Sequence, residues 1–154
     1  MPAPPTSLAA AMLQAKARGE PPTFLDVIGV EFGELQEGNA WLKFEVREEH
    51  CRTGGILHGG AIATLLDTLC GMSAATSIPA TQDLVTAQLN INYIRPAVPG
   101  EVLTGHGHVE HRGKRTLICR SEVRKPDGQL LAMATATMMI LDTRVGAAPP
   151  PAGT

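Results

Sequence analysis

The stretch "GGILHGGAIATLLDTLCGMSAATS", residues Gly54–Ser77, decides how the rest of the chain is read. It is rich in Ala, Leu and Ile, and Asp67 is the single carboxylate within it. From Gly59 onward the composition predicts a long helix, and a helix that is apolar all round is buried all round. The stretch therefore predicts one long buried helix that carries an acid.

Asp67 is the unusual residue of this helix, because an ionised carboxylate in an apolar setting is costly unless it is paired, hydrogen-bonded or placed at a cavity. One interpretation is a purely structural network in which a neighbouring hydroxyl satisfies the acid. The candidate hydroxyls belong to Thr64, Thr68 and Thr86. The other interpretation is an acid or base that faces a cleft.

The glycine pair Gly59-Gly60 stands where the helix begins, directly after His58. Backbone N–H groups at a helix N-terminus have no partner within the helix, and glycine lets a ligand oxygen approach them closely. The pair therefore forms either an oxyanion hole or anion cradle, or only a tightly packed loop.

Gly59 and Asp67 are eight residues apart, which places them about 12 Å apart along one helix. One carbonyl group cannot contact both. Two such helices, antiparallel across a two-fold axis, would set Gly59 of one chain beside Asp67 of the other. The spacing thus predicts an obligate homodimer with two equivalent sites.

The sequence around the helix predicts mainly strands, after a short N-terminal helix, and the turn "KPDGQ" joins the last two strands. We expect an α+β fold, with a largely antiparallel sheet of five to six strands around one long buried helix. The division is residues 1–22 as an N-terminal extension, 23–143 as the domain and 144–154 as a flexible Pro/Ala/Gly tail. The expected elements are a helix over Leu8–Arg18 and strands over Phe24–Leu35, Ala40–Val46, Asp83–Tyr93, Glu101–His111, Arg115–Lys125 and Gln129–Asp142.

Composition excludes several classes of protein. The 154 residues carry a net charge of −2 and only 3% aromatic side chains, so neither a nucleic-acid partner nor a membrane surface is expected. The apolar helix is interrupted by an acid and a glycine, which argues against a membrane span. Three widely spaced cysteines and the absence of a signal-peptide pattern predict a soluble, cytoplasmic protein.

Three segments together resemble the hotdog-fold acyl-CoA thioesterases, closest to their PaaI-like, phenylacetate-pathway branch. They are "GGILHGGAIATLLDTLCG", "VTAQLNINYIRPAVPGE" and "VEHRGKRTLICRSEVRKPDGQLLAMATAT", and the resemblance covers about residues 24–142. It implies a curved sheet wrapped around a helix, dimers that often pair into tetramers, and hydrolysis of an acyl-CoA substrate with no metal and no cofactor beyond the CoA of the substrate.

The resemblance also implies roles for individual residues. Asp67 would activate water or attack the acyl carbon, and the N–H of Gly59, with Gly60 beside it, would bind the thioester carbonyl. His58 would help to fix the carbonyl or thiolate region. Thr86 occupies the position of a hydroxyl that orients the attacking water.

Two regions leave open questions about substrate binding. Arg52 stands where relatives commonly have Asn or Gln, so it either binds the carbonyl differently or points away. The turn that contains Arg112, Lys114 and Arg115 is either a solvated hairpin tip or a contact for the pantetheine and phosphates of CoA.

Other functions are weighed against the hydrolase. His106 and His108 share a strand face, but no third ligand follows at a spacing typical of zinc. An enoyl-thioester hydratase or dehydratase of the same fold would carry an acid–histidine pair with a different spacing. A non-catalytic acyl-CoA binder or sensor would be expected to carry a regulatory domain, for which 154 residues leave little room.

Overall fold

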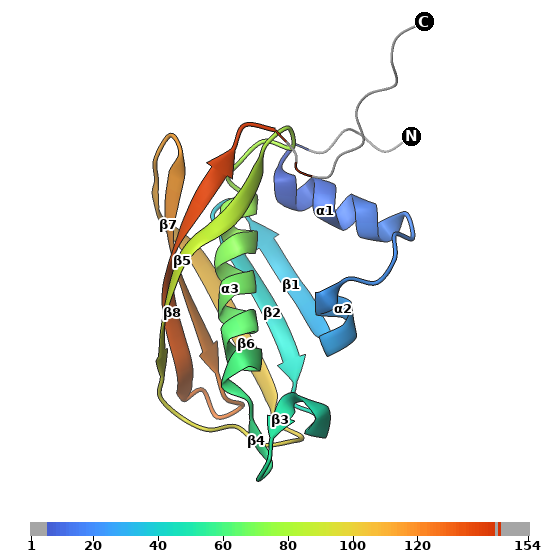
Figure 1. Ribbon diagram of the computed structural model, residues 1–154, viewed down its shortest axis with the longest axis vertical. Helices are drawn as coiled ribbons and strands as arrows, with labels where there is room; N and C mark the ends of the chain where they lie inside the picture. Colours follow the sequence, from blue (N-terminus) through green and yellow to red (C-terminus); the bar gives the residue numbers. More distant parts are fainter. Residues whose placement is uncertain (1–5, 144, 146–154) are drawn as a thin grey trace, which may run out of the picture.

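The computed structural model describes residues 6–143 and 145, and Figure 1 shows a sheet that wraps around one long helix. The sheet has six strands, and two short helices lie on its open side. The elements in chain order are α1 (Leu8–Ala17), α2 (Phe24–Ile28), β1 (Val30–Gln36), β2 (Asn39–Glu45), a 3-10 turn (Glu48–His50), β3 (Cys51–Arg52), β4 (Ile56–Leu57), α3 (Gly59–Ala75), β5 (Asp83–Tyr93), β6 (Val102–Arg112), β7 (Thr116–Arg124) and β8 (Leu130–Leu141).

The strands follow the order β1-β2-β6-β7-β8-β5, and every neighbouring pair is antiparallel. Strands β1 and β5 are therefore the two edges of the sheet. Helix α3 packs against the inner face that these strands form together. The α+β class and the hotdog arrangement predicted from the sequence are confirmed.

The core lies between α3 and the sheet because alternate strand residues point inward. In β2 the inward residues Ala40, Leu42 and Phe44 are buried, as their alternation with polar residues predicts. Two glycines of β6 let the helix approach the sheet: a Cβ added at Gly107 would lie 2.4 Å from the backbone oxygen of Leu69. No side chain fits at that position.

The expected strand over Phe24–Leu35 is wrong in its first part, because residues 24–28 form the short helix α2. The carboxylate of Asp26 accepts hydrogen bonds from the backbone N–H and the hydroxyl of Thr23, which caps the helix N-terminus. Gly29 ends the helix in the left-handed conformation, with φ of 82°. Local capping thus outweighs the alternating pattern.

The prediction that α3 is buried on all sides fails within a single chain. Its sheet-facing residues are fully buried, but Gly60 is exposed and Asp67 and Gly71 are partly exposed. The reason is that the sheet covers one side of the helix, and α1 and α2 approach the other side only in part (Figure 1).

The N-terminal helix is confirmed and packs on the domain. Ser7 caps it by accepting a hydrogen bond from the N–H of Ala10, and Leu8 is buried.

Within residues 6–143 and 145, no helix is both long and apolar enough to cross a membrane. Apart from Val145, the predicted tail lies outside the described residues.

Candidate active site

The N-terminus of α3 offers one backbone donor. His58 caps the helix, and its Nδ1 accepts a hydrogen bond from the N–H of Gly60 at 2.8 Å. The N–H of Ala61 donates to the His58 carbonyl at 2.9 Å. Among the described residues, nothing accepts a hydrogen bond from the N–H of Gly59. The Gly59 N–H is therefore free within the described chain.

This cap bears on the ligand-binding roles expected for Gly60 and His58. The Gly60 N–H is occupied by His58, so it is not available to a substrate in this arrangement. Because Nδ1 acts as an acceptor, a neutral His58 ring must carry its proton on Nε2. The exposed imidazole can then donate this N–H to a bound ligand.

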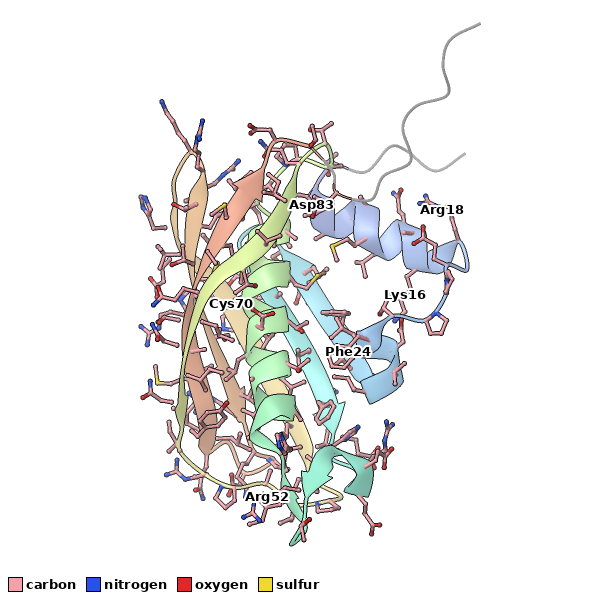
Figure 2. The ribbon with its side chains drawn as sticks, in the orientation of Figure 1. Lys16, Arg18, Phe24, Arg52, Cys70 and Asp83 are labelled. Carbon is pink, nitrogen blue, oxygen red and sulfur yellow. The ribbon has the colours of Figure 1, made fainter. Side chains whose placement is uncertain are left out.

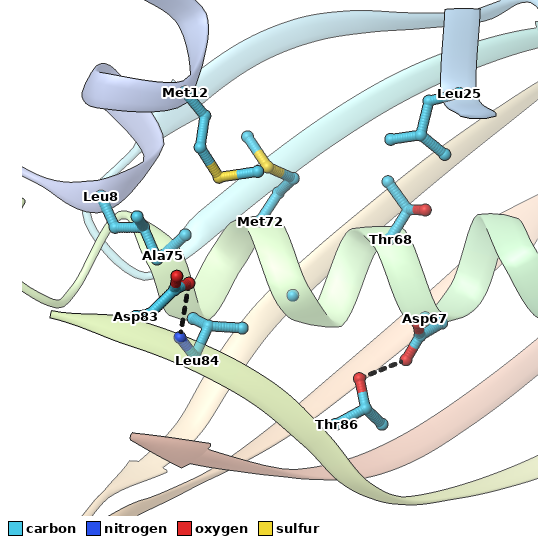
Figure 3. A pocket seen from close by; sticks show the side chains of 11 residues that line it. Leu8, Met12, Leu25, Asp67, Thr68, Met72, Ala75, Asp83, Leu84 and Thr86 are labelled. Atoms are coloured by element: carbon cyan, nitrogen blue, oxygen red, sulfur yellow. Dashed lines mark hydrogen bonds between the residues drawn. The ribbon is translucent and has the colours of Figure 1, made fainter. Parts of the chain in front are cut away.

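Asp67 is held by a single hydroxyl. Thr86 Oγ1 donates to Asp67 Oδ1 at 2.8 Å, shown by a dashed line in Figure 3. Of the other candidate hydroxyls, Thr64 donates instead to the Gly60 carbonyl at 3.0 Å. Asp67 Oδ2 accepts no hydrogen bond from the described part of the chain and remains available to a water or a substrate.

The contact between Thr86 and Asp67 depends on a β-bulge. Simple alternation along β5 places Thr86 on the face opposite to Leu89 and Ile91. In the structure the register with β8 shifts between Thr86 and Gln88, so that Ala87 is the extra residue. The bulge turns Thr86 to the same side as Leu89 and Ile91, toward α3.

The structure does not bring Gly59 and Asp67 together within one chain. Helix α3 runs without interruption from Gly59 to Ala75, so the two groups remain about 12 Å apart.

The end of β5 brings Tyr93 to Gly59: the Tyr93 hydroxyl donates to the Gly59 carbonyl at 3.2 Å. The sequence analysis did not single out Tyr93, since only the pairing of β5 places it beside the helix.

Arg52 and the basic turn lie at opposite ends of the molecule. Arg52 is exposed near the start of α3, and its guanidinium donates to the Thr53 carbonyl at 2.7 Å within its own loop (Figure 2). The turn with Arg112, Lys114 and Arg115 is exposed at the other end of the sheet (Figure 1). Because β5 spans that length with Tyr93 near Gly59, the turn is about 30 Å from Gly59 in the same chain.

A groove of about 190 Å³ lies beside Asp67 and was not predicted. Helix α3 forms its floor, β5 one wall, and α1 and α2 the other (Figure 3). Its lining is mainly apolar, with Asp67 and Thr86 among the polar groups. The groove needs side chains from four separate elements, so no local sequence pattern reveals it.

The cysteines and histidines elsewhere do not form a second reactive centre in the described chain. Burial raises the pKa of Cys70 to about 12 and that of Cys119 to about 11, so both remain protonated thiols. His106 Nε2 pairs with Asn39 Oδ1 at 3.0 Å, and His108 Nε2 with Glu110 Oε1 at 2.9 Å. Over residues 6–143 and 145, no three His, Cys, Asp or Glu side chains are grouped to hold a metal ion.

Comparison with known proteins gives the family. The model of the thioesterase superfamily matches residues 54–132. A Saccharolobus solfataricus protein named as a candidate esterase is 36% identical over 124 residues, which cover 80% of this chain and 85% of that protein. Human acyl-coenzyme A thioesterase 13 is 32% identical over 101 residues, covering 65% and 71% of the two chains.

A solved structure agrees. A Streptococcus mutans protein, crystallised with bound acetyl CoA, superposes with a TM-score of 0.72 at 28% identity and covers 82% of this chain and 98% of its own. The chain belongs to the thioesterase superfamily, and the resemblance inferred from its motifs is confirmed. Its reaction class is thioester hydrolysis.

Proposed function

We propose that the protein is an acyl-CoA thioesterase whose two equivalent sites are each shared between the subunits of a homodimer. One observation carries the proposal: a free N–H at Gly59 and a groove-facing carboxylate at Asp67 lie on one straight helix, about 12 Å apart. They can act on one carbonyl only if a second helix supplies one of them.

The two edges of the sheet favour β5 as the dimer contact. The outer edge β1 carries Glu31 and Glu34 and a register shift, features that discourage strand pairing. Strand β5 has no charged side chain from Leu84 to Ile94, and Val85 and Tyr93 are about half exposed. Antiparallel pairing of two β5 strands would continue the sheet and set the two α3 helices side by side in opposite directions.

The same two-fold axis explains the basic turn. It reverses the ends of the partner, so the partner's turn with Arg112, Lys114 and Arg115 comes to the end of the molecule where α3 begins. Guanidinium and ammonium groups bind phosphates well, and CoA carries its phosphates at the far end of the pantetheine arm from the thioester. Coenzyme A binding is supported by the S. mutans relative, which was solved with acetyl CoA.

The chemistry needs few groups, because a thioester is already electrophilic. Asp67 Oδ2 takes a proton from a water molecule, and the resulting hydroxide adds to the thioester carbonyl carbon. The carbonyl oxygen gains the negative charge and is stabilised by the partner's Gly59 N–H, with the partner's His58 Nε2–H beside it. The C–S bond then breaks, and the CoA thiolate recovers the proton from Asp67. Thr86 keeps the carboxylate in position throughout.

A panel of short, medium, long and aryl acyl-CoAs tests the proposal by release of free thiol. We expect at least one substrate to be hydrolysed well above the buffer rate, by a protein that light scattering shows to be a dimer or a dimer of dimers. Binding of acyl-CoA without turnover of any substrate would favour the non-catalytic binder. Loss of enoyl absorbance with an enoyl-CoA, without thiol release, would favour the hydratase.

A further inference from the structure

The groove beside Asp67 has a wall that comes from outside the matched family region. The thioesterase model covers residues 54–132, whereas Leu8 and Met12 of α1 and Leu25 of α2 line the groove. Helices α1 and α2 thus form part of the surface around the proposed catalytic carboxylate.

This wall is fixed to the domain at both ends. The N–H of Leu8 donates to the Ile78 carbonyl at 3.0 Å, and the Leu8 side chain is only 2% exposed. An ion pair between Lys16 and Asp26 joins α1 to α2, and the Ile28 carbonyl at the end of α2 accepts a hydrogen bond from the Arg47 guanidinium at 3.4 Å. The wall therefore keeps a defined place over α3 and can set a size limit.

Met12 reaches from α1 toward Met72 of α3 across the groove (Figure 3). Both side chains are flexible thioethers, which adapt to an apolar ligand and still close the space behind it. Beyond them the carboxylate of Asp83 accepts hydrogen bonds from the N–H groups of Leu84 and Val145 at this end of the groove. The groove therefore accepts an uncharged, apolar group of limited length.

The floor of the groove has one position without a side chain. Gly71 follows Asp67 by one helical turn and lies on the same face of α3. A Cβ added there would meet nothing within 4 Å. Glycine inside a helix is less favourable than alanine. Since packing within the chain does not require it, the missing side chain leaves room next to the carboxylate.

We infer that Met12 is a specificity-determining residue, which together with Met72 ends the acyl pocket and limits the enzyme to compact, uncharged acyl groups. The inference rests on the proposed function, because it assumes that the thioester carbonyl sits at Asp67. A dry cavity of about 150 Å³ holds benzene, so the groove of about 190 Å³ fits an acyl group of about six to eight carbons.

The test is kcat/KM for straight-chain acyl-CoAs from acetyl to palmitoyl. For the unmodified protein we expect a maximum near six to eight carbons. Met12→Ala opens the end of the groove and should raise kcat/KM for dodecanoyl-CoA relative to hexanoyl-CoA by about tenfold. Met12→Phe fills it and should shift the maximum toward shorter chains.

Leu13→Ala is the matched control. Leu13 is the next residue of α1, is similarly exposed at 39% against 45% for Met12, and lines a separate hollow with Leu35 and Thr76. Its removal should leave the chain-length profile unchanged. Identical profiles for Met12→Ala, Met12→Phe and the unmodified protein would overturn this inference and leave the thioesterase proposal standing. Hydrolysis of no chain length would overturn both.

Discussion

The two faces of helix α3 differ in how closely they are packed and how far they are exposed. Toward the sheet, Leu65 and Leu69 are fully buried, and Gly107 of β6 places no side chain between the sheet and the Leu69 backbone. Away from the sheet, the helix shows Gly60, Asp67 and other small or polar residues that stay partly exposed. The first face is determined by packing against its own chain, and the second is left available for a ligand and a second chain.

Glycine occurs on both sides for different reasons. At Gly107 the helix backbone is so close that a Cβ would overlap it, whereas at Gly71 a Cβ would have open space. One glycine permits contact and the other maintains a void. Substitutions on the two faces of α3 separate these two roles.

Asp67→Asn removes the charge from the open face with almost no change in shape. We expect kcat to fall by about two to four orders of magnitude, because the base that activates water is lost. The dimer and the affinity for a non-hydrolysable acyl-CoA analogue should survive, as measured by light scattering and calorimetry. A variant that kept most of its activity would remove Asp67 from the mechanism.

Gly107→Ala tests the packed face. The added methyl would lie 2.4 Å from the Leu69 backbone oxygen, so helix and sheet must separate. We expect the free energy of unfolding in urea to drop by about 2 to 3 kcal/mol at fixed protein concentration. Gly71→Ala is the matched substitution on the open face, where stability should hold or rise by up to about 1 kcal/mol. Equal losses at both sites would contradict the comparison.

Thr86→Val replaces the hydroxyl that donates to Asp67 by a methyl group of the same size. Without that donor the carboxylate loses its fixed orientation, and we expect kcat to fall by about tenfold. Thr86→Ser retains the donor and should keep most of the activity. If the valine and serine variants had equal kcat values, the hydrogen bond would have no role in the reaction.

His58→Ala should have the smallest effect on activity. The variant loses one donor at Nε2 and the cap on Gly60, but the Gly59 N–H remains in place. We expect kcat/KM to decrease by about three- to tenfold, less than for Asp67→Asn. A loss as large as that of Asp67→Asn would make His58 a principal catalytic group.

The sequence was sufficient to predict the sheet, the long helix and the residues at its start, because alternation and apolar composition report burial directly. It failed at α2, where the bond from Thr23 to Asp26 is a local cap hidden within an alternating stretch. It also failed at the bulge near Ala87, since that register is fixed by pairing with β8. Alternation alone predicts that Thr86 faces away from Asp67, whereas the structure places the two in contact.

Several contacts around the candidate site were not predicted from the sequence. Tyr93 meets Gly59 through the end of β5, and Met12 meets Met72 through the placement of α1. These contacts join residues far apart in the chain, so they depend on the complete tertiary arrangement. Asp67 and Gly59 could be selected as candidates from the sequence because each is unusual within its own local context.

In the proposed mechanism Gly59 and Asp67 act on one carbonyl from opposite subunits, and subunit exchange tests this arrangement. Asp67→Asn and Gly59→Val, which blocks the backbone donor, should each be inactive alone. After exchange, a mixed dimer would regain one intact site of two, so an equal mixture should reach about a quarter of the unmodified activity.

The reciprocal mixture is the control. A double variant with both substitutions, exchanged with the unmodified protein, should form inactive mixed dimers, since each site then lacks one group. Exchange is followed by mass spectrometry of tagged subunits. Recovery of activity in the first mixture and its loss in the second is the predicted result. No recovery in the first mixture despite complete exchange, together with active mixed dimers in the second, would show that both groups act within one chain and contradict the account.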